Sequence, residues 1–168
     1  DILRNWHAFW PTTGRAQNWD AVGKIKMTDG TEEWLLVEAK AHVREVRSSV
    51  CKAGHRSRKK IEKALDKTKA ACGAGSTLLE NWLGAYYQYA NRLAALYFLR
   101  EVCQPPIPAR LLYIYFLRDI FEDKQCPETR EEWEPTIDQV ESQLGINRDC
   151  PLYARVNKLF LHVNPEAK

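Results

Sequence analysis

The chain has 168 residues, which is one domain's worth and enough to build a hydrophobic core. Hydrophobic residues make up 45% of it and charged residues 28%, both ordinary for a globular chain. No apolar run reaches the ~18 residues that a membrane helix needs, so we expect no membrane partner. The five cysteines are widely spaced and show no zinc-site pattern, which favours free thiols in a reducing, cytoplasmic compartment.

The first elements are a short helix and two strands. Residues 2–10 are typical of the end of a helix, and Pro11 breaks it. Residues 18–27 alternate weakly between apolar and polar, as expected of a strand. Residues 28–30, Thr-Asp-Gly, suit a three-residue turn with glycine in the left-handed conformation, so the next strand should fold back antiparallel to the first.

The second strand, residues 34–42, carries charged side chains on one face. Successive side chains of a strand point to opposite sides, so Glu38, Lys40 and, if the strand continues, His42 project together. The apolar residues between them form the other face. Charged groups at the end of an apolar strand cost desolvation free energy unless a partner offsets it. A metal ion with an anionic substrate would be such a partner, and so would a plain salt bridge.

The turn decides which residues face each other across the hairpin. With a three-residue turn, Asp20 lies directly opposite Glu38. A two-residue turn would shift the pairing by one position and place Asp20 opposite Ala39, on the wrong face. The turn sequence permits both, and we favour the first.

Opposed carboxylates are typical of a site for a hard divalent cation. Side chains that face each other lie roughly 5 Å apart, and two carboxylates at that distance repel unless a cation lies between them. Magnesium prefers oxygen ligands and keeps several waters. Asp20, Glu38 and the backbone of Ala39 are therefore candidate ligands of Mg²⁺ or Mn²⁺, with Lys40 beside them.

Asp20 followed by Glu38-Ala39-Lys40 resembles the D…ExK signature of the PD-(D/E)xK nuclease superfamily, which has the restriction-endonuclease-like fold. The resemblance covers the hairpin closely and the remainder loosely, as a strand–strand–helix–strand order. It implies an α/β fold with a mixed central β-sheet flanked by α-helices. It also implies metal-dependent hydrolysis of phosphodiester bonds in nucleic acid, with DNA as the expected substrate.

Two features depart from the superfamily pattern. Trp19 precedes the aspartate where many members have proline. Asp1 alone is acidic ahead of the hairpin, so the helix on which many members carry a further acid is expected to be missing, or the chain to be a fragment. We otherwise expect a single domain over residues 1–168.

A strongly basic segment follows the second strand. Residues 44–69 hold ten basic and three acidic side chains, whereas the whole chain carries a net charge of only +3. Such a segment favours a polyanionic partner, although a solvated helix face is an equally ordinary explanation. The candidates for contact with a nucleic-acid backbone are Arg44, Arg56, Arg58, Lys59, Lys60 and Lys63. We expect helices over residues 43–53 and 57–72.

The longest expected helix covers residues 78–102 and starts at a capping-box pattern at Thr77. Its apolar and aromatic residues are far more typical of a core stripe than of base-stacking groups. Some members of the superfamily support their site with a glutamine on such a helix, and Gln88 is the candidate here. The tyrosine usual four residues later is replaced by Arg92.

The last third of the chain supplies two more strands and a helix. Residues 110–117 are almost continuously apolar, which predicts a central strand buried on both faces. Residues 131–144 predict a helix with Gly145 as its C-cap, and residues 156–163 predict the last strand. The order of elements implies an α/β sandwich.

The leading hypothesis is a Mg²⁺-dependent nuclease in which Asp20 and Glu38 hold the ion and Lys40 acts beside the attacking water. His42 either contacts the phosphate or makes a structural hydrogen bond. A second hypothesis is a nuclease-like domain that has lost activity and binds nucleic acid or serves as a scaffold. A third is a structural ion-pair cluster in an unrelated α/β protein.

Overall fold

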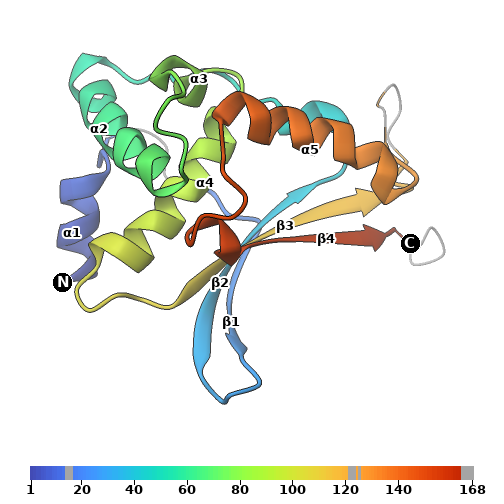
Figure 1. Cartoon of the computed structure of the whole chain (residues 1–168), viewed down its shortest axis with the longest axis horizontal. Coiled ribbons are helices and arrows are strands. Elements are labelled where there is room, and N and C mark those ends of the chain that lie inside the picture. The colour runs from blue at the N-terminus through green and yellow to red at the C-terminus, as the bar shows by residue number, and fades with distance from the viewer. Residues whose placement is uncertain (14–16, 121–123, 125, 164–168) are drawn as a thin grey trace.

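The computed structural model describes residues 1–13, 17–120, 124 and 126–163 (Figure 1). The elements in chain order are α1 (Ile2–Phe9), β1 (Ala21–Lys26), β2 (Glu32–Lys40), η1 (Val43–Val46), α2 (His55–Ala71), α3 (Leu79–Leu83), α4 (Tyr87–Tyr97), η2 (Phe98–Val102), β3 (Ala109–Leu117), α5 (Arg130–Leu144), η3 (Tyr153–Arg155) and β4 (Val156–His162).

The strands form one mixed sheet in the order β1-β2-β3-β4. β1 and β2 pair antiparallel, whereas β2, β3 and β4 run parallel to one another. The two parallel steps each need a long crossover, and the helices of the chain supply it: α2 to α4 connect β2 to β3, and α5 connects β3 to β4. The expected mixed α/β architecture is confirmed.

The hairpin has the register that a three-residue turn dictates. The Met27 amide donates to the Thr31 carbonyl at 2.8 Å, and Gly30 has a φ of 85°, a conformation that residues other than glycine rarely adopt. Ala21 pairs with Val37. The favoured pairing of the two strands is therefore confirmed over the alternative that was shifted by one position.

β3 is an interior strand, as predicted, but the expectation that it is buried on both faces is wrong. Its side chains alternate: Leu111, Tyr113 and Tyr115 are buried, whereas Leu112 and Ile114 are only half-buried. The strand is therefore apolar along its whole length, but its two faces differ in burial. Only one of these faces contributes side chains to the hydrophobic core.

The helices of both crossovers pack against the same face of the sheet. Tyr89 of α4 stacks on Tyr113 at 4.5 Å, and Trp133 of α5 lies 4.9 Å from the ring of Tyr115. Right-handed crossovers that step in one direction across a sheet place their helices on one side, which explains the arrangement. Figure 1 shows these helices gathered above the strands.

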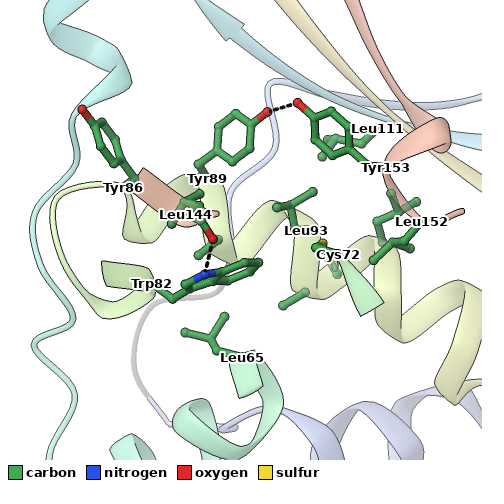
Figure 2. Packing of buried hydrophobic residues seen from close by; sticks show 14 of the residues in the cluster. Leu65, Cys72, Trp82, Tyr86, Tyr89, Leu93, Leu111, Leu144, Leu152 and Tyr153 are labelled. Atoms are coloured by element: carbon green, nitrogen blue, oxygen red, sulfur yellow. Dashed lines mark hydrogen bonds between the residues drawn. The ribbon is translucent and has the colours of Figure 1, made fainter. Parts of the chain in front are cut away.

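The core lies between this helical layer and the sheet (Figure 2). Several of its polar atoms are paired: the Trp82 indole N–H donates to the Leu144 carbonyl at 2.9 Å, and the hydroxyls of Tyr89 and Tyr153 lie 2.9 Å apart, whereas the Tyr113 hydroxyl is buried without a hydrogen-bond partner among the described residues. Buried polar groups need such partners because leaving one unsatisfied costs about 1–3 kcal/mol. These bonds tie α3 to the end of α5, and α4 to η3.

Two of the predicted helices are wrong in extent. Residues 43–53 form only the single turn η1, and an extended segment follows in which the Cys51 amide donates to the Leu83 carbonyl at 2.8 Å. The helix expected over residues 78–102 is interrupted at Gly84, which adopts a non-helical φ of −88° and ψ of −141°. Thr77 does not cap α3, since the cap position is Leu78 and makes no side-chain bond.

The other boundaries agree closely with expectation. α2 places Ile61, Ala64, Leu65 and Thr68 in the core, as its spacing predicts. α5 ends at Gly145 in the left-handed conformation, with a φ of 67°. The five cysteines are free thiols. Within the described residues, no helix is long and apolar enough to cross a membrane.

Candidate functional site

The charged end of β2 lies beneath the helical layer. Glu38 is 2% exposed and Lys40 8% exposed, and the Lys40 ammonium donates to Glu38 Oε1 at 2.5 Å. The strand holds both side chains on its helix-facing side because they are two residues apart. A buried carboxylate and ammonium are retained only when both are paired, and each of these has more than one partner.

α4 supplies the additional partners. Gln88 Oε1 accepts a hydrogen bond from Lys40 Nζ at 3.0 Å, and Arg92 Nε donates to Glu38 Oε2 at 2.6 Å. Gln88 and Arg92 are one helical turn apart and therefore lie on the same side of α4. The structure thus brings the predicted residue Gln88 to Lys40.

Arg92 was not among the predicted site residues. Its Nη2 donates to the Asn18 carbonyl at 2.5 Å, and its guanidinium stacks over the Trp19 ring at 4.4 Å. The arginine therefore connects α4, the end of β2 and the residues just ahead of β1. The only signal for it in the sequence is its spacing of four from Gln88, because the contacts themselves join residues far apart along the chain.

Asp20 lies directly ahead of β1, whose last pair with β2 joins Ala21 and Val37, and its facing Glu38 stays a prediction. Its amide donates to the Val37 carbonyl at 3.2 Å, one step beyond the last paired residue of β1. Its side chain is exposed, and Oδ2 accepts the amide of Ala39 at 2.7 Å. The carboxylate thus takes the place of a strand carbonyl at this end of the hairpin.

His42 does not extend the charged face, because β2 ends at Lys40. The imidazole is buried, and Nε2 lies 3.2 Å from Glu45 Oε1. The other oxygen of Glu45 accepts the Ala41 amide at 2.7 Å. His42 and Glu45 therefore hold together the turn that follows β2, while Glu38 and Lys40 point at α4.

Three tyrosines line the buried side of the site, next to Glu38. A cavity of about 10 Å³ separates Glu38 from Tyr89, Tyr113 and Tyr115, which is room for no more than one water molecule. Burial raises the pKa of Tyr113 well above its usual value, and the neighbouring Tyr115 and Glu38 add to the effect. The wall behind Glu38 is therefore neutral and tightly packed, so a ligand must approach from another side.

A cleft of about 750 Å³ opens on that other side. Gln88 and Arg92 form part of its wall, together with Asn18, and its lining also includes Lys52 and Ser57 of α2. Burial raises the pKa of Tyr87, which also lines the cleft, so its hydroxyl stays neutral. The cleft is thus open, has a lining of mixed polar and apolar residues, and includes the two α4 residues that hold Glu38 and Lys40.

Some basic side chains of residues 44–69 are bonded within the protein, and others lie at the surface. Arg58 pairs with Glu62 at 2.9 Å, and Lys60 Nζ donates to the His7 carbonyl at 2.8 Å. Lys69 is buried and bonds the Thr77 carbonyl at 2.7 Å. The remaining predicted backbone contacts, all at least partly exposed, are Arg44, Arg56, Lys59 and Lys63. The last three share one side of α2, at a spacing of three and four.

Across the described part of the chain, no three or more His, Cys, Asp or Glu residues gather as a ready set of metal ligands. The two candidate ligands with carboxylates are Asp20 and Glu38, supplemented by the backbone of Ala39. Comparison with known proteins adds no assignment: no family model matches, and no curated protein or solved structure shows significant similarity.

Proposed function

We propose that this protein is a metal-dependent nuclease that hydrolyses phosphodiester bonds of DNA. The observation that carries the proposal is the arrangement of Asp20, Glu38 and Lys40. Asp20 directly precedes Ala21, which pairs with Val37 next to Glu38, and Lys40 is held at the same end of β2 by Glu38 and Gln88. The resemblance to the restriction-endonuclease-like nucleases rests on the same three residues and extends to Gln88.

The oxygen atoms of the candidate ligands suit a hard divalent ion. Asp20 and Glu38, with the backbone of Ala39, would hold Mg²⁺, which prefers oxygen ligands. The exposed side chain of Asp20 suits this role, whereas Glu38 is buried and its Oε2 is bonded to Arg92. A bound ion lowers the pKa of a coordinated water and polarises a phosphoryl oxygen.

Lys40 suits a role in stabilising the charge that builds up during hydrolysis. An ammonium has three donors and no lone pair, so it cannot bind the metal. Two of its donors point to Glu38 Oε1 and Gln88 Oε1, which leaves a third for an attacking water or a phosphate oxygen. Preorganised donors of this kind lower a barrier most effectively in a site that excludes water.

The adjoining cleft and α2 support an extended anionic substrate. The cleft touches the site at Gln88 and Arg92, and its wall also includes Gly54 and Ser57 at the start of α2. Arg56, Lys59 and Lys63 lie at the surface of α2 and would contact phosphates without reading the bases.

A second candidate function is supported by a separate observation. Both oxygens of Glu38 are bonded to cationic groups, Lys40 and Arg92, so the charge of the carboxylate is balanced without any metal. A nuclease-like domain that retains the fold and the basic surface but only binds nucleic acid would have such a site. The two candidates differ in whether a divalent ion binds at Glu38 and supports cleavage.

A plasmid-nicking assay separates them. The wild-type protein with Mg²⁺ should convert supercoiled plasmid to nicked or linear forms, and Ca²⁺ should support binding with little cleavage. Asp20→Asn keeps an oxygen for the Ala39 amide and removes the charge, so it should abolish nicking while the fold is preserved. Plasmid that stays supercoiled at every Mg²⁺ and Mn²⁺ concentration, yet is retarded on a gel, would favour the binding domain.

A further inference from the structure

We propose that Arg92 is a built-in cation that competes with a divalent metal ion for Glu38, and that a phosphate bound in the adjacent cleft relieves this competition. The inference rests on the proposed metal site and adds its regulation: metal and nucleic acid should each strengthen the binding of the other.

The competition follows from the two oxygens of Glu38. Lys40 donates to Oε1 at 2.5 Å, and Arg92 donates to Oε2 at 2.6 Å. A magnesium ion requires a ligand oxygen at roughly 2.0–2.1 Å, so an ion at Oε2 would lie within a few ångströms of the guanidinium. The two cations repel each other at that distance, so binding of the ion favours movement of the guanidinium away from Glu38.

The charge of Arg92 cannot be removed by deprotonation, because the pKa of a guanidinium lies above ~12 in proteins. Its side chain is 5% exposed and is held by the Asn18 carbonyl and the Trp19 ring as well as by Glu38. Its positive charge therefore opposes the binding of a metal ion to Glu38 whenever the cleft is empty. A competing anion on its other side would draw it away from the carboxylate and weaken this opposition.

The cleft offers a place for that anion. Arg92, Asn18 and Gln88 belong to its wall, and Lys52 lies in the same lining. A guanidinium binds a phosphate through two parallel hydrogen bonds, which is a stronger contact than most neutral ones. A phosphodiester in the cleft would thus exchange one anionic partner of Arg92 for another and release Glu38 Oε2 to the ion. Linked binding of this kind is reciprocal by thermodynamic necessity.

The test is Mn²⁺ binding measured by electron paramagnetic resonance, with and without a short phosphorothioate oligothymidylate that resists cleavage. For the wild-type protein, the oligonucleotide should tighten Mn²⁺ binding by roughly 10-fold, within the usual range for coupled sites. Arg92→Gln should bind Mn²⁺ about that much more tightly without the oligonucleotide and show no further gain with it. Arg92→Lys retains the charge and should retain part of the coupling.

Arg130→Gln is the matched control, because it removes one arginine charge from an exposed pair on α5 and should leave both affinities unchanged. Thermal unfolding in EDTA establishes that each variant is folded. Equal Mn²⁺ affinity and equal coupling in wild type and Arg92→Gln would overturn the inference.

The failure of the proposed function has a different signature. If Arg92→Gln binds Mn²⁺ more tightly and loses the coupling, but neither protein nicks plasmid, the competition at Glu38 stands and the nuclease activity does not. If neither protein binds Mn²⁺ under any condition, the metal site itself is wrong, and the inference falls with it.

Discussion

Lys40 is the residue whose surroundings say most about the chemistry of the site. It is 8% exposed, and its ammonium is oriented by two acceptors, one charged and one neutral: Glu38 Oε1 and Gln88 Oε1. A salt bridge alone would not require the second acceptor. An ammonium fixed from two sides is preorganised to donate its remaining proton in one direction, which is what stabilisation of a developing negative charge requires.

Replacing Lys40 by methionine should separate chemistry from metal binding. The variant keeps a long apolar side chain but loses the donors, so Mg²⁺ affinity should be unchanged or slightly raised, because a repelling charge has gone. The single-turnover cleavage rate should fall by roughly 10²–10³-fold, the usual effect of removing one donor to a transition-state charge. Calorimetry measures the affinity, and quenched-flow gel assays measure the rate.

Glu38→Gln is the companion variant and should lose Mg²⁺ binding and cleavage together. Because removing one partner of a buried ion pair can cost about 3–5 kcal/mol, both variants need a thermal unfolding curve before their activity is interpreted. Cleavage at the wild-type rate by folded Lys40→Met would mean that Lys40 is only a salt-bridge partner of Glu38.

Among the elements, α2 and α4 both follow the hairpin but contribute to different parts of the molecule. α4 contributes Gln88 and Arg92 to the buried site, whereas α2 inserts Ile61 and Leu65 into the core and turns its basic residues outward. Two of the basic residues near its start are already engaged, Arg58 by Glu62 and Lys60 by the His7 carbonyl. Fewer basic side chains of α2 are therefore available to a ligand than its composition indicates.

Substituting Arg56, Lys59 and Lys63 together by alanine should weaken nucleic-acid binding and flatten its salt dependence. Removing each phosphate contact should lower the slope of log K against log salt by about 0.9 for duplex DNA, because fewer counterions are released. Fluorescence anisotropy over a range of salt concentrations measures the slope. Arg130→Ala on α5 removes one exposed charge elsewhere and serves as the control. A slope identical to that of the wild type would identify this side of α2 as an ordinary solvated face.

For the molecule as a whole, the helices pack on one face of the sheet and give it two unlike faces. The face that meets α4 and α5 holds Leu111, Tyr113 and Tyr115, which are almost completely buried. The opposite face is also largely apolar, yet Leu159 and Leu161 on β4 are 41% and 38% exposed. Apolar residues on the two faces therefore do not contribute equally to stability, because only the face beneath the helices is almost completely removed from water.

Two substitutions in neighbouring strands test this difference. Leu159→Lys should change the free energy of unfolding by no more than about 0.5 kcal/mol, as expected at an exposed position. Leu111→Ala should lower it by about 2–5 kcal/mol, because it leaves a cavity beneath the helices. Urea denaturation followed by circular dichroism measures both. A loss of several kcal/mol in Leu159→Lys would show that this face is packed in the native protein.

The features that could be predicted from the sequence are those that depend on neighbours along the chain. The turn at Gly30 was enough to predict the hairpin register, in which Ala21 pairs with Val37, and the alternation of β2 was enough to put Lys40 on the same side as Glu38. The spacing of Ile61, Leu65 and their neighbours was enough to find α2. In each case the geometry follows from the period of the element and the turn beside it, both of which are local.

The features that only the tertiary structure decided involve groups that are distant along the chain. Gly84 interrupts a stretch with a continuous helical pattern, and the two faces of β3 differ although its residues are uniformly apolar. The pairing of Arg92 with Glu38 joins residues 54 positions apart. Local propensity contains no information about such contacts, because they form only after two crossovers have placed the helices over one face of the sheet and buried the carboxylate beside the guanidinium.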